Sequence, residues 1–563
     1  MFIKILILII FPIFILANEI KTLDFEGDVD LVISDFSKSN LEKVCNISYP
    51  TFYKFWQKNP TFTKEDIIIC NESINEYAQS LGFYKAETSY EIKDDKAVIT
   101  LKKNEQIKIS SIEIENEYKN IIDLKVGDFF KASNFTNSKK AIKKYLHEKS
   151  FAKASLDAKA YVDMEDYKVD IIYKVTKNAP QYFGKVSLEN NAKVDENYIK
   201  EKIEFKEGEL YNSLLVDETY ENLYNFGIYK YISIEQNIDT QDDTIPVNIK
   251  LLLGDYRETT YGIGYDTDTK ARFKAQYKND NFWGNLKKLT IGTKINEDGY
   301  EFYNNINNPY FYFDGLSFNN DINYENMDYT SYEQEKIEEK ISLSKDFFGL
   351  SHTVGFLLEH SNINSLLEEY KSGNYLLNSL FYEVILDKRD DILNPKNGYY
   401  LSFYIENGTK MILSEEDYIK TLTQLRYIKT FDKLTTSIKT KIGTLDKDLP
   451  IFKHFFAGGD YSNRGYSYEK LGLLDSDDNP YGGLSMIDSS LEFEYNVYKD
   501  VGIATFFDST MLTLEPKKFN DNFYNSYGFG LRYYTPIGPL RADIGFPLED
   551  SGFVFHIGIG QVF

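Results

Sequence analysis

The sequence predicts a chain of two unlike parts: repeated α+β modules, about three in number, followed by an antiparallel β-barrel of about 16 strands that spans a membrane. Three observations predict this fold. Side chains in the carboxy-terminal half alternate between apolar and small or polar, which is the period of a β-strand. Tyrosine and phenylalanine are unusually frequent. The amino-terminal part instead repeats helical and strand-like patches at intervals of roughly 75 residues.

The clearest strands are the last three runs of the chain, 527–534, 540–546 and 553–560. Their apolar face carries Tyr527, Phe529, Leu531 and Tyr533, then Leu540, Ala542, Ile544 and Phe546, then Phe553, Phe555, Ile557 and Ile559. The opposite face carries small or polar side chains. The runs approach the roughly 9–11 residues that a tilted membrane-crossing strand needs, and their connections are short. They therefore favour an outer-membrane barrel over a soluble sandwich.

The composition agrees with a barrel and argues against other classes. Aromatic residues make up 16% of the 563 residues, with 46 Tyr and 41 Phe but 2 Trp, as expected for belts at both lipid–water boundaries. A mean hydropathy of −0.42 and 27% charged residues argue against a bundle of membrane helices. The net charge of −23 argues against nucleic acid as a partner, since phosphate recognition needs a basic surface.

The first residues predict a secretion signal. Lys4 supplies the positive start, residues 5–16 form an apolar stretch, and Ala17 precedes a polar sequence. We therefore expect a signal peptide over 1–17, cleaved after Ala17.

The chain has 2 cysteines, Cys45 and Cys70, both near the amino end. An exported chain meets an oxidising compartment, so we expect one disulfide between them. The alternative is a pair of buried, unpaired thiols.

Helices followed by strand pairs recur three times between residues 20 and 255. The first helix ends near Gly82, the second contains 139–149, and the third ends near Gly227. Each set opens with a strand of its own. We divide the chain into modules 18–104, 105–179 and 180–255 and a barrel over 256–563. A strand, two helices and two strands resemble the polypeptide-transport-associated (POTRA) modules, and the alternative is an array of unrelated α+β repeats.

A long connection in the barrel half, from about Leu445 to Gly483, carries the most specific pattern in the chain. Its segment 454–466, His-Phe-Phe-Ala-Gly-Gly-Asp-Tyr-Ser-Asn-Arg-Gly-Tyr, resembles the loop-six signature of the BamA/TamA outer-membrane assembly superfamily. The segments 389–395 and 261–268 and the tail from Gly530 to Phe563 also resemble barrel segments of this superfamily. About three modules with this total length point to its TamA branch, since a BamA would be expected to carry more.

The resemblance implies that this loop folds back into the barrel lumen. Its signature residues are Gly458, Gly459, Asp460, Arg464, Gly465 and Tyr466. Arg464 would meet Asp508, which follows Phe506 in the next strand but one, and Glu492, which alternation places on the inward face. A guanidinium offers a rigid donor fork to carboxylates and so can hold a long loop. The alternative is a solvated surface arginine. The sequence departs from the family at Asn463, where a small aliphatic residue is usual, at His454, where arginine is usual, and at Thr510, where glycine is usual.

Glycines mark the strands that should close the barrel: Gly262 and Gly264 in the first, Gly558 and Gly560 in the last. Glycine weakens strand pairing, and the resemblance implies a lateral gate at this seam, where a client strand could pair with the first strand. The alternative is that these glycines make room for the folded-in loop. Phe553, Phe555 and the terminal Phe563 fit the carboxy-terminal signal by which barrels are recognised for insertion.

No catalytic or metal-binding pattern is present, so we expect neither an enzyme nor a cofactor nor a metal. The 5 histidines, His147, His352, His360, His454 and His556, lack the spacing of metal ligands. No nucleophile elbow or phosphate-binding loop occurs.

The resemblance implies an assembly factor of the Gram-negative outer membrane with its modules in the periplasm. It implies unfolded outer-membrane proteins, autotransporter-like barrels among them, as clients. It also implies a TamB-like partner anchored in the inner membrane, contact with outer-membrane lipids and a link to phospholipid transport. The main alternative is a two-partner secretion exporter that passes a polypeptide through its lumen. A passive porin explains neither the repeats nor Arg464.

Overall fold

The computed structural model describes residues 20–30, 34–50, 58–313, 315–392, 394–498, 500–535 and 538–559. The predicted signal peptide over 1–17 and the predicted roles of Gly560 and Phe563 lie outside these residues. None of the helices described is long and apolar enough to span a bilayer.

Three modules of one topology precede the barrel. Each has a three-stranded sheet whose order is first, third, second strand: β1-β3-β2, β4-β6-β5 and β7-β9-β8. In the first two modules the opening strand pairs parallel with the third, and the second and third strands are antiparallel. One repeated pattern in the sequence therefore produces one repeated fold, as predicted.

The first module contains β1 (Thr22–Gly27), α1 (Lys38–Val44), α2 (Lys64–Ser80), β2 (Glu87–Lys93) and β3 (Lys96–Lys102). A reciprocal capping box starts α2, since the Thr63 side chain accepts from the Asp66 N–H and the Asp66 carboxylate accepts from the Thr63 N–H. The Thr63 N–H and the Thr63 hydroxyl both donate to the Asp66 carboxylate and lower its pKa. Ile67 and Ile74 of α2 are completely buried against the sheet. The sulfur atoms of Cys45 and Cys70 are bonded, with their Cα atoms 4.7 Å apart, so the bridge ties the end of α1 to α2.

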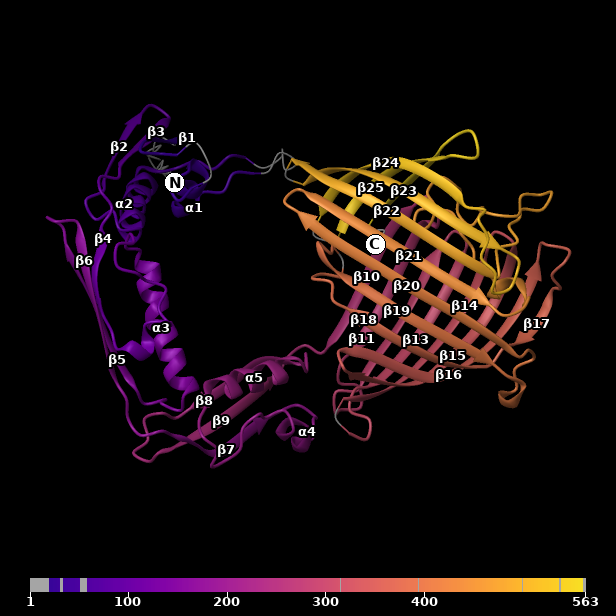
Figure 1. Ribbon diagram of the computed structural model, residues 1–563, viewed down its shortest axis with the longest axis horizontal. Helices are drawn as coiled ribbons and strands as arrows, with labels where there is room; N and C mark the ends of the chain where they lie inside the picture. Colours follow the sequence, from indigo (N-terminus) through magenta and orange to yellow (C-terminus); the bar gives the residue numbers. More distant parts are fainter. Residues whose placement is uncertain are drawn as a thin grey trace, which may run out of the picture. The chain divides into compact units, whose positions relative to one another are not determined.

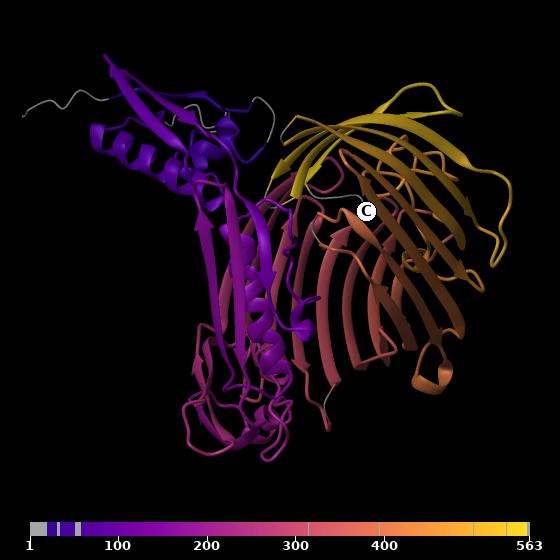
Figure 2. The same cartoon turned by 60° about the vertical axis from the view of Figure 1, so that its left-hand side comes forward.

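The second module contains β4 (Lys108–Glu113), the 3₁₀ turn η1 (Asn116–Tyr118), α3 (Ala132–Glu148), β5 (Ser155–Asp163) and β6 (Lys168–Thr176). α3 lies along one face of the sheet (Figure 2). Its Ile142 and Leu146 share a buried cluster with Val169 and Ile171 of β6. The apolar residues of α3 recur three to four positions apart, so one helical face is buried.

The third module contains β7 (Tyr182–Asn190), α4 (Glu196–Lys200), α5 (Ser213–Tyr224), β8 (Tyr229–Gln236) and β9 (Thr244–Leu253). The Phe183 ring of β7 stacks on Phe205, with centroids 4.1 Å apart. Ile245, Val247 and Ile249 alternate inward along β9 and are buried. The chain then passes directly into the barrel.

The barrel is one antiparallel sheet whose strands follow sequence order from β10 to β26 (Figure 1). Its strands are β10 (Arg257–Asp266), β11 (Lys270–Asn279), β12 (Lys288–Asn296), β13 (Gly299–Asn308), β14 (Leu316–Asp328), β15 (Tyr332–Phe347), β16 (Leu350–Ser365), β17 (Gly373–Leu376), β18 (Ser379–Asp387), β19 (Asn397–Gly408), β20 (Tyr418–Phe431), β21 (Leu434–Leu445), β22 (Ser485–Tyr498), β23 (Val501–Thr513), β24 (Tyr524–Thr535), β25 (Gly538–Pro547) and β26 (Val554–Ile559). β17 and β18 both pair with β16 in consecutive register, so they are one interrupted strand, and the 17 segments make a 16-stranded barrel. The predicted fold class is confirmed.

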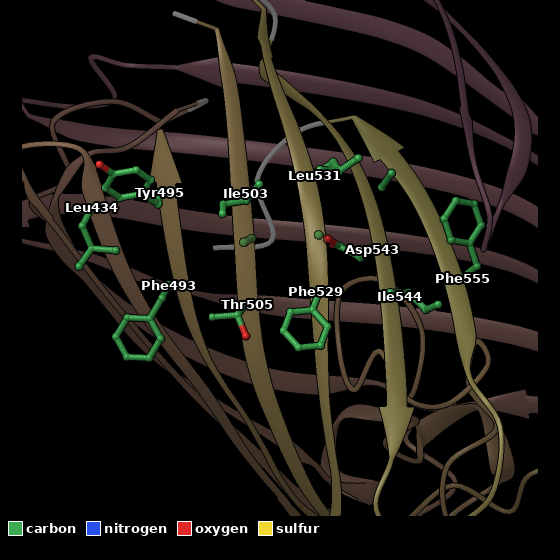
Figure 3. Close-up of a pocket in the computed structure, with 13 residues that line it drawn as sticks. Leu434, Phe493, Tyr495, Ile503, Thr505, Phe529, Leu531, Asp543, Ile544 and Phe555 are labelled. Carbon is green, nitrogen blue, oxygen red and sulfur yellow. The ribbon is translucent and has the colours of Figure 1, made fainter. Parts of the chain in front are cut away.

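The strands are apolar outside and polar inside. Along β16, Val354, Phe356 and Leu358 are exposed on the outer face, whereas Gly355 and Glu359 face inward and are buried. Figure 3 shows the same pattern near the carboxy terminus, where Phe529 and Phe555 project from the outer face beside a groove of about 710 Å³. Hydrocarbon outside and polar groups inside require this alternation.

Several strands exceed the expected length. β15 and β16 each have 16 residues, against the roughly 9–11 that a tilted crossing requires. Polar residues such as Glu333 and Asn364, paired at one end of these strands, are exposed. These strands therefore extend beyond the apolar band as a paired ribbon.

Removing the disulfide should destabilise the first module. The bridge closes a loop with a sequence separation of 25, so Cys45→Ser/Cys70→Ser should lower its free energy of unfolding by about 3 kcal/mol. Amide hydrogen exchange of the full chain checks this, with α2 and β3 expected to exchange faster. The second and third modules are the internal control. Unchanged protection of α2 would show that the bridge contributes no stability.

Candidate functional site

Loop six, defined as residues 446–484 between β21 and β22, is a folded segment inside the barrel. Phe455 and Gly483 pair through reciprocal backbone hydrogen bonds of 2.9 and 2.8 Å. Phe455, Ala457, Leu471 and Leu484 are buried in one cluster with Leu445 and Met486 of the adjoining strands. Loop six therefore has a small core of its own, which it shares with the barrel wall.

Arg464 is the most heavily bonded residue of loop six. Its side chain is 0% exposed and makes a two-point contact with Asp508 of β23, with Nε–Oδ2 and Nη2–Oδ1 both at 2.9 Å. Nη1 reaches Glu492 Oε2 of β22 at 2.5 Å. The guanidinium carbon lies 3.3 Å from the centroid of the Phe506 ring. The structure thus brings together the four residues on which the predicted loop anchor rests.

Two further arginines extend this contact into a charge network. Arg532 of β24 bonds Asp543 of β25 at 2.5 Å and Glu492 at 3.1 Å. Arg541 of β25 holds Asp460 of loop six through two bonds of 2.9 and 2.7 Å. Each arginine is matched by carboxylates, which is required when charges leave water. Loop six is therefore held at two of its own residues, Asp460 and Arg464.

Two of the departures from the family pattern, Asn463 and Thr510, lie together in space. Asn463 is buried, accepts from the Ser526 hydroxyl at 2.6 Å and donates to the Tyr524 carbonyl at 2.9 Å. Thr510 donates to Asp488 at 2.8 Å and lies 3.4 Å from the Asn463 amide. A polar asparagine in the loop is thus matched by polar groups in the wall, which satisfies both.

Two glycines of the last strands leave space for loop six. A Cβ on Gly545 would lie 2.2 Å from the Arg464 carbonyl oxygen, and one on Gly558 would lie 2.6 Å from Asp460 Oδ2. Around Gly262 and Gly264 the nearest atoms belong to Lys274 and Arg272 of the neighbouring strand. The last-strand glycine Gly558 therefore makes room for the loop, and the first-strand glycines do not.

A second attachment, which the sequence analysis missed, lies before the signature. Lys453, in the 3₁₀ turn η3 (Ile451–Lys453), bonds Glu359 of β16 at 2.7 Å and Glu406 of β19 at 3.0 Å. Its side chain is 7% exposed, and both acids are 5% exposed. Alternation along the strands predicts that Glu359 and Glu406 point into the barrel. No pattern in the sequence pairs these acids with Lys453. Loop six is thus bonded to strands on both sides of β21.

The seam between β10 and β26 is barely paired. The two strands are the ends of the sheet order and share no ladder among the described residues. The Thr267 N–H donates to the Ile557 carbonyl at 3.1 Å. His556 Nε2 lies 2.9 Å from the Arg464 carbonyl oxygen, and Asp268 accepts from the Asp460 N–H at 2.7 Å. Loop six therefore contacts His556 of β26 and Asp268 of the turn that follows β10, where the two edge strands approach each other.

The remaining predicted residues lie as follows. Gly458 and Gly459 have φ of 102° and 95°, a conformation that favours glycine. Tyr466 donates to Glu549 at 3.2 Å. Phe553 and Phe555 face outward with 64% and 50% exposure. Sequence reasoning had put Arg541 and Asp543 on the polar face of their run, but it did not connect either to the loop.

Breaking the Lys453 contact should destabilise the barrel. Lys453→Met leaves Glu359 and Glu406 buried without their cation, at a cost of about 3–5 kcal/mol in the free energy of unfolding. The urea midpoint, followed by the mobility of unheated samples on gels, checks this. Adding Glu359→Gln and Glu406→Gln should restore most of the loss. An unchanged midpoint for Lys453→Met would show that this contact is not stabilising.

Comparison with known proteins agrees with this architecture. The model of the Omp85 superfamily domain matches residues 281–563, and the POTRA model, described as surface antigen variable number repeat, matches 105–178 and 181–252. The outer membrane protein assembly factor BamA of Nitratidesulfovibrio vulgaris is 21% identical over 588 residues, which cover 97% of this chain and 73% of that protein. BamA of Neisseria meningitidis serogroup B is 18% identical over 635 residues, covering 97% and 78%.

Among solved structures, that of BamA from Haemophilus ducreyi lacking POTRA domains 1–3 superimposes with a TM-score of 0.67 at 18% identity. The superposition covers 81% of this chain and 100% of the other chain, and it shows a shared fold. The superfamily match extends over half of the sequence, through loop six to the terminal residue. The chain therefore belongs to the Omp85 superfamily, as a protein of the Gram-negative outer membrane whose POTRA domains lie in the periplasm.

Proposed function

We propose that this protein inserts or translocates other outer-membrane proteins. The observation that carries the proposal is the weak seam together with the loop beside it. Among the described residues no ladder joins β10 to β26, so each strand has one edge without a strand partner, and such an edge is a template for another strand. Loop six meets that edge through Asp460 and Arg464. The free edge can therefore pair with a client strand, and loop six stabilises the barrel wall beside it.

The proposal extends to the TamA branch. Three modules of one topology precede the barrel in this chain, which supports the proposal. We assign residues 18–104, 105–179 and 180–255 to the modules and 256–563 to the barrel. On this view the clients are autotransporter-like barrels, a TamB-like protein docks on the first module, and phospholipid transport is linked to that partner.

Two rival functions make different demands on the lumen. An exporter must pass a polypeptide through it, and a porin must keep it open. Loop six lies inside the barrel and is bonded through buried ion pairs on both sides of β21, which favours an assembly factor. Single-channel conductance separates an assembly factor from a porin, since an assembly factor should be mostly occluded and a porin steadily open.

Deleting the gene tests the function directly. The outer membrane of the deletion strain should lose a subset of β-barrel proteins, which quantitative proteomics of that membrane measures. Capture on residues 20–255 should recover an inner-membrane-anchored partner. Loss of a single secreted polypeptide with an unchanged barrel inventory would instead support an exporter.

Removing the loop anchor should abolish activity without preventing membrane insertion. Arg464→Ala leaves Asp508 and Glu492 buried without their shared cation, and Arg464→Lys cannot reproduce the two-point contact. Client assembly in vesicles should fall roughly tenfold or more for both variants. Arg389→Ala, which removes a two-point contact with Asp387 outside loop six and the seam, is the matched control. Normal assembly by Arg464→Ala would remove this role.

Closing the seam should also stop assembly. Thr267→Cys/Ile557→Cys places one thiol on each side of the seam, beside an existing backbone hydrogen bond. Oxidation should block client assembly, and reduction should restore it. The control pair Val384→Cys/Phe403→Cys joins β18 to β19, which are already paired, and should leave assembly unchanged. Full activity of the oxidised seam variant would eliminate the gate.

A further inference from the structure

His454 of loop six is a buried imidazole that takes no part in the Arg464 anchor. It follows directly after η3, and its side chain is 0% exposed. It stands at a position where arginine is usual in this superfamily. Both residue types can be positively charged, but only the charge of histidine changes between about pH 5 and 8. The hydrogen bonds of His454 decide which of its protonation states fits the loop.

Both ring nitrogens of His454 face oxygen atoms that accept hydrogen bonds. Nδ1 lies 2.9 Å from the carbonyl oxygen of Tyr481. Nε2 lies 2.9 Å from the carbonyl oxygen of Leu449 and 3.1 Å from Asp448 Oδ1. A neutral imidazole has one N–H, so its other nitrogen would direct a lone pair at an acceptor oxygen. The imidazolium has two N–H groups and therefore satisfies both sides.

These contacts join the two ends of loop six. Asp448 and Leu449 belong to the stretch that leaves β21, whereas Tyr481 belongs to the stretch that enters β22. The backbone pair of Phe455 and Gly483 lies next to them in the chain. Because the ring is bonded to both stretches, it closes loop six at its base.

The charged and titratable groups around the ring come from two elements. Asp448 and Tyr481 face it from loop six. Tyr370, in the connection between β16 and β17, lies edge-on to the ring with centroids 5.1 Å apart, and its hydroxyl donates to Asp448 at 3.3 Å. Further groups are Glu368 and Glu369 of the same connection and Lys453, whose Nζ is bonded to two acids of the wall. The charge in contact with the ring is therefore negative.

Three of these neighbours keep one charge state while a histidine titrates. The hydrogen bond with His454 lowers the pKa of Asp448. Burial raises the pKa of Tyr370, and a hydrogen bond with Glu369 raises that of Tyr481. Asp448 therefore stays ionised, and both phenols stay neutral, between about pH 5 and 8. A change of loop six in this range that depends on this contact thus reports the ring itself.

We propose that His454 is a pH-sensitive clasp, which closes the base of loop six as an imidazolium and releases it on deprotonation. The two bonds together require the charged ring, so closure of the loop holds a proton. Closure is fully stabilised below the pH at which a free histidine titrates, and it weakens as the pH rises and His454 loses its proton. In strong acid, protonation of Asp448 weakens it from the other side. Arg464 is bonded to the wall independently of this ring, so deprotonation loosens the base of the loop and leaves its anchor in place.

Nuclear magnetic resonance of the ring tests the charged state. In the full chain with ¹⁵N-labelled histidine, the signals of His454 are those that disappear in His454→Gln. At about pH 6 both ring nitrogens should show one-bond N–H splittings, because hydrogen-bonded protons exchange slowly. His360→Gln, at an exposed histidine of β16, is the matched control and should leave these signals unchanged. A ring with one N–H or none at this pH would overturn the clasp.

Distances between spin labels test the closure. One label is placed at Leu473→Cys, since the Leu473 carbonyl accepts from the Tyr481 N–H, and the other at Met411→Cys in the turn η2 (Lys410–Ile412). Both side chains are exposed, and the native cysteines are bridged and do not react. Between about pH 6 and about pH 8.5 the ratio of open to closed loop should rise roughly tenfold, as expected for hydrogen bonds of a charged group.

Two variants decide whether the response belongs to the ring. His454→Gln should show the open population at both pH values, and His454→Arg, which keeps its charge, should stay closed at both. A distance distribution that does not change with pH, or a pH response that persists in His454→Gln, would overturn the proposal. Neither measurement involves a client protein, so failure of the clasp is distinguishable from failure of the proposed assembly function.

Discussion

The burial of Arg464 among carboxylates is the interaction on which the rest of the barrel depends. A guanidinium taken out of water is stable only if its charge and its donors are matched. Asp508 and Glu492, on two adjacent strands, provide this match, and the ring of Phe506 covers its face. The arginine belongs to a loop and its partners belong to the wall. The need to compensate this one buried charge therefore determines where the 39 residues of loop six (446–484) lie.

The need to compensate buried charge also applies to other residues of the carboxy-terminal strands. Arg532 and Arg541 share Asp543, so three arginines and their acids form one continuous set. Small residues are needed where the loop meets the wall, at Gly545 and Gly558. Buried ion pairs between loop six and these strands therefore add to the apolar core that the loop shares with the wall. Near the seam, ion pairs between side chains are numerous, whereas backbone hydrogen bonds between β10 and β26 are few among the described residues.

The inner face of the barrel is polar because its buried charges are compensated within the same chain. Lys453 of loop six is paired with Glu359 and Glu406 of the wall. This compensation depends on loop six, since the cation belongs to the loop and both acids belong to strands.

The two-part architecture and the residues of the loop anchor follow from the amino-acid sequence alone. Period-two alternation depends only on neighbouring residues, so strands such as β24 and β25 are predictable from it. Arg464, Asp508 and Glu492 followed from resemblance and parity. The contacts of Arg541 with Asp460, and of Lys453 with Glu359 and Glu406, are visible only in the folded chain. These pairs are separated by 81, 94 and 47 residues, and alternation indicates which face a side chain occupies but not which distant loop will reach it.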